Sequence, residues 1–148
     1  FRLVGAMRPI TTVDEQNFVL IPKMWQDVSS DGTCNKIMNL AKPEKPEMYG
    51  VCCNFRKDEF DYMIAVESDK EVPEEMAELK VAAYTWVKFT CIGQLPKAQQ
   101  DVWKRIYTEW FPTSGYEHAD GPELEWYSNE NMDSDSYVSE IWIPIKKC

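Results

Sequence analysis

The spacing of apolar residues changes several times along the first half of the chain. Where apolar and polar residues alternate, the pattern predicts a strand, and where apolar residues recur every three or four positions it predicts a helix. This rule predicts a strand, two helices and a two-stranded hairpin, at residues Phe1–Thr12, Asp14–Val28, Cys34–Ala41, Tyr49–Phe55 and Phe60–Val66. Pro22 interrupts the first helix and marks either a kink or the first turn of the main helical segment.

The second half repeats this order. It is expected to contain a long strand, the clearest helix of the chain and two closing strands, at Leu79–Ile92, Lys97–Phe111, Glu123–Tyr127 and Tyr137–Ile145. Strand, helix, strand, strand therefore occurs twice, which predicts one α+β domain over 1–148 with pseudo-repeats at roughly 1–76 and 77–148. The expected architecture is a curved antiparallel sheet with helices on one side. A central cleft is expected at the seam of the repeats.

Composition narrows the function classes. The chain has 148 residues, 44% of them hydrophobic, which suits one globular domain. Its net charge of −9 disfavours direct binding to a phosphate backbone. No apolar stretch approaches the roughly 20 residues of a membrane span, and there is no leader-like segment, so no membrane association is expected. Because the chain starts at Phe1, inside an expected strand, we expect it to be a piece of a longer protein.

The few residues able to ligate a metal are scattered. Five cysteines without a C-x-x-C pair indicate reduced thiols in a cytoplasmic protein. The single histidine, His118, lies in a charged segment and is expected to be solvated, as are the acidic runs Glu67–Glu78 and Asn129–Asp135. No metal site and no cofactor is therefore expected.

One carboxylate occupies an unusual position. Glu125 lies between Leu124 and Trp126 in an expected strand, and a carboxylate in so apolar a setting is costly to bury without a partner. Strand alternation alone allows Glu125 and Tyr127 to face solvent while their neighbours face the core. The alternative is a binding site on the Glu125 side of the strand.

A set of short motifs, taken in order, resembles a known family. These motifs are Val4-Gly5, Ile21–Trp25, Tyr49–Cys52, Asp61-Tyr62, Phe89–Pro96, Glu109–Tyr116, Gly121–Tyr127 and Ile141–Lys146. Together they resemble the GyrI-like (gyrase-inhibitor-like) effector-binding domains, which form the C-terminal ligand-sensing part of AraC-type and MerR-type bacterial transcription regulators. The resemblance implies a tandem repeat of strand-helix-strand-strand units around a central pocket.

The resemblance also implies a ligand site. In the multidrug-sensing members a buried glutamate among aromatic rings receives lipophilic cations, and the Glu-x-Tyr segment transfers this role to Glu125. In an apolar pocket the pKa of that carboxyl would rise, and a cation would restore its charged form. Nearby rings would add cation–π attraction of about 0.5–2 kcal/mol each. The candidate ligand-binding residues are Glu125, Trp110, Tyr62, Trp25, Tyr127, Trp142 and Tyr49.

Core packing is the competing role for several of these side chains. Trp25, Trp103 and Trp110 lie on apolar helical stripes, as core residues do. Tyr62 suits the core and a pocket equally well. Trp142 alternates with Ile141, Ile143 and Ile145, so it is expected on the sheet face opposite to theirs, with Glu140.

Three functions compete. The favoured one is a sensor domain for a small, hydrophobic and possibly cationic organic molecule, with the DNA-binding part upstream of Phe1 and absent from this chain. The second is a stand-alone GyrI-like hydrolase of reactive small molecules that uses Glu125 as general base. No Ser-His-Asp or Cys-His set is evident, so no catalytic residue is assigned and an enzyme is less favoured. The third is a module that acts on a partner protein such as gyrase.

Overall fold

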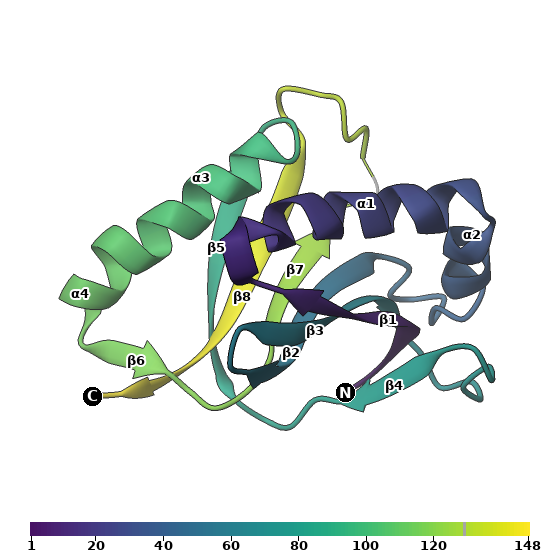
Figure 1. Ribbon diagram of the computed structural model, residues 1–148, viewed down its shortest axis with the longest axis horizontal. Helices are drawn as coiled ribbons and strands as arrows, with labels where there is room; N and C mark the ends of the chain where they lie inside the picture. Colours follow the sequence, from purple (N-terminus) through teal and green to yellow (C-terminus); the bar gives the residue numbers. More distant parts are fainter. Residues whose placement is uncertain (129) are drawn as a thin grey trace. The chain divides into compact units, whose positions relative to one another are not determined.

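The computed structural model describes residues 1–128 and 130–148. Contacts divide the chain into two compact units, Phe1–Ala82 and Ala83–Cys148. Both combine helices with antiparallel strands, so the expected α+β class is confirmed (Figure 1). The boundary between the units follows Ala82, whereas the sequence placed the repeat boundary near residue 76. That the two units act as one effector-binding domain stays a prediction.

The first unit contains an antiparallel sheet in the order β4-β1-β3-β2. Its elements are β1 (Arg2–Thr11), the 3-10 turn η1 (Val13–Glu15), α1 (Asn17–Ser30), α2 (Thr33–Met38), β2 (Met48–Arg56), β3 (Glu59–Glu67) and β4 (Ala77–Lys80). The first helix was expected from Asp14 but begins at Asn17, because Asp14 and Glu15 have positive φ angles of 54° and 58° that an α-helix excludes. Pro22 lies inside α1.

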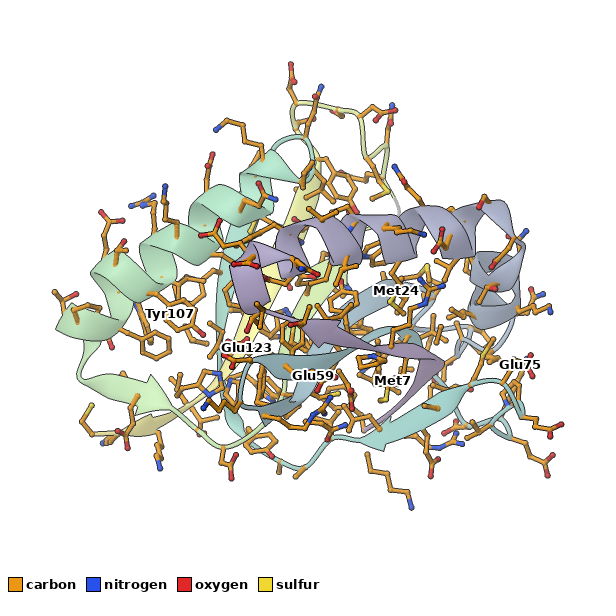
Figure 2. All side chains as sticks on the ribbon, viewed as in Figure 1. Met7, Met24, Glu59, Glu75, Tyr107 and Glu123 are labelled. Carbon is orange, nitrogen blue, oxygen red and sulfur yellow. The ribbon has the colours of Figure 1, made fainter. Side chains whose placement is uncertain are left out.

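The core of the first unit lies between the sheet and helices α1 and α2. Tyr62, Ile64 and Val66 of β3 face Met24 of α1 and Ile37 of α2, and all five are fully buried. Met24 lies beneath α1 in Figure 2. Each such side chain contributes about 1.5–3 kcal/mol by leaving water. The alternation of β3 therefore predicted its helix-facing side correctly.

Gly5 is required where β1 meets β3. A Cβ atom at this position would lie 1.9 Å from the carbonyl oxygen of Ile64 and 2.6 Å from Cα of Ala65. Both obstacles are backbone atoms and cannot rotate away. The Val-Gly pair near the start of the chain thus permits the close pairing of β1 with β3.

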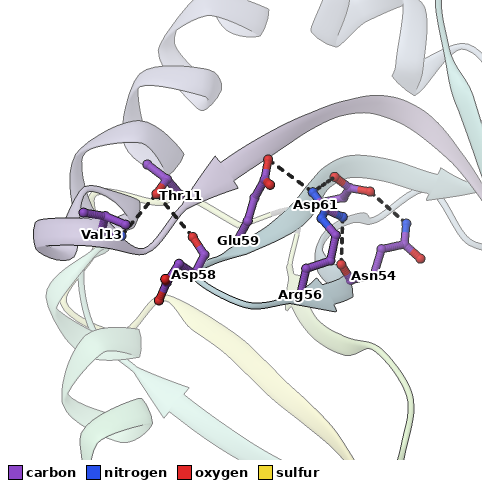
Figure 3. Close-up of polar contacts among 7 residues, drawn as sticks. All are labelled: Thr11, Val13, Asn54, Arg56, Asp58, Glu59 and Asp61. Atoms are coloured by element: carbon purple, nitrogen blue, oxygen red, sulfur yellow. Dashed lines mark hydrogen bonds and ion pairs between the residues drawn. The ribbon is translucent and has the colours of Figure 1, made fainter.

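The β2–β3 hairpin is stabilised by polar contacts (Figure 3). Arg56 reaches Asp61 at 3.1 Å and Glu59 at 3.3 Å, and Asn54 Nδ2 donates to Asp61 at 2.9 Å. The turn expected between the two strands of the hairpin is tighter than the segment 56–59, because Arg56 and Glu59 pair with each other and only Lys57 and Asp58 form the turn. The alternation from Tyr49 to Phe55 predicts that Phe55 shares a face with Tyr49, Val51 and Cys53, but these three are buried whereas Phe55 is 51% exposed. The register of β2 shifts between Cys53 and Arg56, so alternation breaks before Phe55.

Figure 3 also shows how this hairpin meets the segment after β1. The backbone N–H of Thr12 and the hydroxyl of Thr11 both donate to the carbonyl oxygen of Asp58, at 3.0 and 3.2 Å. The same Thr11 oxygen accepts a bond from the N–H of Val13 at 3.2 Å. These bonds anchor the turn that leads into α1.

The second unit uses the same pairing scheme. Its elements are β5 (Thr85–Ile92), α3 (Lys97–Arg105), the π-helical turn η2 (Ile106–Trp110), α4 (Phe111–Ser114), β6 (Tyr116–His118), β7 (Glu123–Tyr127) and β8 (Val138–Lys147). Strand β8 lies between β5 and β7, as β3 lies between β1 and β2, so the strand-helix-strand-strand order is confirmed in both units. Strand β6 pairs with β8 and was not predicted.

The second core is built on the inner face of β8. Ile141 and Ile143 are fully buried and pack with Cys91 and Ile106. Helix α3 runs along β5 and β8 in Figure 1 and, through η2 and α4, extends three residues beyond the expected Phe111. Gly115 ends it in the left-handed region, with φ at 78°.

Two further expectations about the fold were wrong. Leu79–Ile92 is not one strand, because β4 pairs with β1 whereas β5 pairs with β8, and alternation cannot reveal a change of partner. Glu67 was expected in a solvated loop but is only 4% exposed, with Lys42 and Lys45 at 3.4 and 3.6 Å. Asn129, the first residue of the second acidic run, lies outside the described residues.

None of the helices in the described part of the chain has both the length and the apolar character needed to cross a membrane. The five cysteines, Cys34, Cys52, Cys53, Cys91 and Cys148, carry free thiols.

Candidate functional site

Strand β7 presents polar side chains toward helix α3. Its register pairs Glu125 with Ile141, which belongs to the helix-facing core, and pairs Leu124 with Trp142. Cross-strand partners share a face of the sheet, so Glu125 lies on the helix side. Glu123 and Tyr127, two residues away on either side, lie on that face as well. Glu125 therefore shares the sheet face that packs against the helix, and its role in a binding site stays a prediction.

Glu125 accepts two hydrogen bonds within the second unit. The indole Nε1 of Trp103 donates to one carboxylate oxygen at 3.1 Å, and the hydroxyl of Tyr127 donates to the other at 2.9 Å. Glu125 and Trp103 are half-buried, and Tyr127 is 9% exposed. Bonds from neutral donors to a carboxylate are strong and orient it without adding a charge.

Gln99 of α3 extends this arrangement into the core. It is 6% exposed, and its Oε1 lies 3.3 Å from the Tyr127 hydroxyl oxygen. A tyrosine hydroxyl has one proton, and the shorter bond to Glu125 takes it. Exchanging the amide oxygen and nitrogen of Gln99 would give a relay in which Gln99 donates to Tyr127 and Tyr127 donates to Glu125. As placed, Gln99 Nε2 is buried and has no partner among the described residues.

Glu123 is the centre of a second set of polar contacts, in addition to the set around Glu125. One of its oxygens accepts a 2.5 Å bond from the Tyr107 hydroxyl and lies 3.1 Å from His118 Nε2 (Figure 2, which labels Tyr107 and Glu123). Nδ1 of His118 contacts the carbonyl oxygen of Ala119. Because both ring nitrogens face acceptors, we assign both protons to the ring and a positive charge to His118. The hydrogen bond to Glu123 raises the pKa of His118, while burial acts in the opposite direction. The expectation that His118 is solvated was wrong.

A row of aromatic rings accompanies these carboxylates. Trp103 stacks on Tyr107 with 6.1 Å between ring centres, Tyr107 lies 5.4 Å from Phe111, and Phe111 stacks on His118 at 6.4 Å. The first three rings are four residues apart and so follow one side of the helix across η2. We call the following residues the β7 cluster: Gln99, Trp103, Tyr107, Phe111, His118, Glu123, Glu125 and Tyr127.

The family is shown by sequence comparison. The family model of Cass2, described as integron-associated effector binding protein, matches residues 1–145. The chain belongs to the Cass2 family. A DNA gyrase inhibitor from Erwinia billingiae (strain Eb661) is 30% identical over 87 residues, which are 57% of this chain and 56% of the relative. The chain thus matches about half the length of this curated relative, and the GyrI-like resemblance is confirmed.

The fold of this chain is similar to that of several solved structures. A candidate bacterial transcription regulation protein from Staphylococcus aureus MU50 has a TM-score of 0.82 at 22% identity, covering 98% of this chain and 92% of that one. SAV2435, solved bound to tetraphenylphosphonium, scores 0.85 at 21% identity and covers 98% and 88%. An integron cassette protein from the mobile metagenome of Vibrio cholerae scores 0.72 at 22% identity and covers 99% and 90%.

In this Cass2-family chain two predicted residues of the second unit, Trp110 and Trp142, lie apart from Glu125. Trp110 packs in the core against Phe89, Phe111 and Tyr116, with ring centres at 5.2, 5.0 and 6.2 Å, and meets the β7 cluster through Phe111. Trp142 is paired with Leu124 and so lies on the opposite face of the sheet from Glu125.

Trp142 has its own partners on that opposite face. Its Nε1 donates to Glu140 at 2.9 Å, Lys88 Nζ lies 3.9 Å from its ring centre, and Trp86 meets it edge-on at 6.3 Å. The expected orientation of Trp142 with Glu140, away from the isoleucines, is confirmed.

Three predicted residues belong to the first unit. Trp25 Nε1 donates to the hydroxyl of Tyr62 at 3.0 Å, and Tyr62 is fully buried in the core under α1. Tyr49 is 6% exposed and pairs with Ala65, whereas Tyr62 pairs with Cys52, so the two tyrosines lie on opposite faces of the sheet. The structure thus joins Trp25 with Tyr62, and Glu125 with Tyr127.

Sequence reasoning missed several members of the β7 cluster. Trp103 was assigned to core packing, and Gln99, Tyr107 and Glu123 were not considered. Two signals were present in the sequence. Trp103, Tyr107 and Phe111 follow one another at four-residue intervals, and Glu123, Glu125 and Tyr127 at two-residue intervals. The described residues contain no group of three or more His, Cys, Asp or Glu side chains placed to hold a metal ion.

Proposed function

We propose that this chain binds a hydrophobic organic cation and that Glu125 supplies the countercharge. The observation that carries the proposal is the β7 cluster, in which Glu123 and Glu125 share one strand face with a row of aromatic rings along the facing helix. Glu125 is oriented by Trp103 and Tyr127, both neutral donors. Such an arrangement holds a negative charge in place next to apolar surface.

Physical chemistry favours a cation with a dispersed charge over a compact one. A large organic cation loses little hydration when it meets aromatic rings, whereas an ammonium ion loses much more. At about 5 Å from a carboxylate, with an effective dielectric constant near 20, the attraction is roughly 3 kcal/mol. Cation–π contacts with the rings of Trp103 and Tyr107 would add about 0.5–2 kcal/mol each.

The comparisons support the same ligand class. SAV2435, of the same fold, was solved with tetraphenylphosphonium, and the Cass2 family is described by effector binding. We further propose that the chain acts as a multidrug-type sensor in the cytoplasm, within an AraC-type regulator whose DNA-binding part lies elsewhere. Ligand binding would shift the population of two states of that regulator.

A thermal-shift experiment tests the proposal. Tetraphenylphosphonium is compared with neutral triphenylphosphine oxide on the wild-type chain, Glu125→Gln and the control Glu140→Gln, whose carboxylate lies on the other sheet face. At 100 times its dissociation constant a ligand adds about 2.7 kcal/mol of stability, or roughly 5–11 °C in Tm. We expect that shift for the cation with wild type and Glu140→Gln, and a smaller shift with Glu125→Gln. Equal shifts for cation and neutral compound would refute the proposal.

A further inference from the structure

Two sulfur–sulfur contacts converge on the thiol of Cys34 in the first unit. The thiol sulfur of Cys34 lies 4.0 Å from the thioether sulfur of Met38 and 3.8 Å from that of Met48. Cys34 and Met38 are one helical turn apart on α2, and Met48 is the first residue of β2. Local sequence thus supplies two of the sulfurs, and the fold brings in the third.

The third sulfur is held in place by the connection between α2 and β2. The backbone N–H of Lys42 donates to the carbonyl oxygen of Glu67 at 2.9 Å, and the side chains of Lys42 and Lys45 both approach the buried Glu67 carboxylate. These contacts attach residues 39–47 to the end of β3. Met48 therefore enters β2 next to α2, without needing to move to reach Cys34.

The surroundings of the three sulfurs leave a route for an ion. Cys34 and Met48 are half-buried and pack against the apolar core of the first unit, whereas Met38 is 49% exposed. An exposed methionine at the edge of a core gives the ion access, and the apolar side removes competing water.

The chemistry of this donor set selects the metal. One thiolate and two thioethers are soft ligands, which favour monovalent copper over hard cations. With metal–sulfur bonds of about 2.3 Å, the length of a zinc–thiolate bond, three sulfurs in a trigonal plane lie about 4.0 Å apart. The two separations from Cys34, 4.0 Å to Met38 and 3.8 Å to Met48, match two edges of such a triangle. A monovalent ion on one thiolate is neutral overall, whereas a divalent ion would leave a positive charge against the core.

We propose that Cys34, Met38 and Met48 form a binding site for Cu(I). On binding, the Cys34 thiol releases its proton to solvent, its sulfur forms a bond to copper, and each methionine sulfur donates a lone pair. Copper enters and remains as Cu(I), so no oxidant or reductant is consumed.

This proposal is independent of the proposed function, because it uses only residues of the first unit. The sequence predicted no metal site because His, Cys and carboxylates were the ligands considered, and methionine sulfur is not among them. The signal in the sequence is Cys34 and Met38 at helical spacing, with Met48 ten residues later.

Anaerobic competition with the Cu(I)–bicinchoninate complex tests the site. The parent protein carries Cys148→Ser, which removes the exposed terminal thiol. The variants are Cys34→Ser, Met38→Leu and Met48→Leu, and the control is Met132→Leu, a methionine of the second unit that is 48% exposed. Leucine conserves methionine's volume, and circular dichroism confirms that each variant is folded.

We expect the parent and Met132→Leu to remove one equivalent of copper from bicinchoninate. Copper affinity should fall about ten-fold or more in each Met variant and further in Cys34→Ser. X-ray absorption at the copper edge should show three sulfurs in the parent and two in Met48→Leu. The site is overturned if the parent removes no copper, or if Met38→Leu and Met48→Leu bind it as tightly as the parent.

Discussion

Removal of one hydroxyl group, in Tyr127→Phe, tests whether the β7 cluster holds Glu125 as described. The hydroxyl donates to Glu125 at 2.9 Å and lies 3.3 Å from Gln99, in a side chain that is 9% exposed. The ring remains, so packing changes little and the loss is mainly that of a hydrogen bond to a charged group. Such a bond is worth about 1.5–3 kcal/mol, and we expect the free energy of unfolding to fall by that amount.

Two other tyrosines of the second unit provide the comparison. Tyr107→Phe removes a bond to Glu123, but Tyr107 is 49% exposed and water can replace its hydroxyl, so the expected loss is below about 1 kcal/mol. Tyr84→Phe removes a bond to the Asp120 carbonyl at 3.2 Å from a partly exposed ring, and should change stability by no more than about 0.5 kcal/mol.

Urea unfolding followed by circular dichroism measures these differences, with the slope checked to be unchanged. A double-mutant cycle of Tyr127→Phe with Glu125→Gln then isolates the contact between the two side chains. We expect a coupling energy of about 1 kcal/mol or more. A loss below about 0.5 kcal/mol in Tyr127→Phe, or a coupling energy near zero, would show that this hydroxyl does not support the charge on Glu125.

Two further predictions concern His118 and Gly5. The pKa of His118 is raised by Glu123, so the stability from this contact is full below the ordinary value of about 6.5 and is lost as the pH rises through the raised folded value. Urea unfolding from about pH 6 to about pH 9 should therefore show a decline that His118→Gln lacks, and identical pH profiles would refute the assignment of a charged ring. Gly5→Ala should destabilise the first unit by about 2 kcal/mol or more, because its methyl group would overlap the Ile64 carbonyl oxygen. A Tm equal to that of the wild type would contradict the close pairing of β1 with β3.

Local pattern was enough to predict most elements of the fold. The strand Glu123–Tyr127 has the predicted bounds, and the helix predicted from Lys97 begins at that residue. In both segments the apolar residues recur with one clear period. Such a period depends only on residues close together in the sequence, so it predicts the element without knowledge of the rest of the fold. The prediction of a single strand over Leu79–Ile92 was wrong because apolar and polar residues alternate throughout this segment, although its two ends pair with different strands.

The candidate site was only partly predictable for a related physical reason. Alternation says which residues share a face, but not what covers that face. Glu125 was identified through its motif. Its hydrogen-bond donor Trp103 could not be distinguished from other residues on an apolar helical stripe. His118 was expected to be solvated because nothing in the sequence indicates that β6 places it beside Glu123. Trp142 was placed correctly beside Glu140, yet only the pairing of β7 with β8 shows that this face is not that of Glu125.

The dissociation constant of tetraphenylphosphonium tests whether Glu125 is the countercharge for an organic cation. Isothermal titration calorimetry would compare the wild-type chain with Glu125→Gln and Glu140→Gln. We predict that Glu125→Gln weakens binding about ten- to a hundred-fold, or about 1.4–2.7 kcal/mol, while Glu140→Gln binds as the wild type does. Equal dissociation constants for the wild type and Glu125→Gln would contradict it.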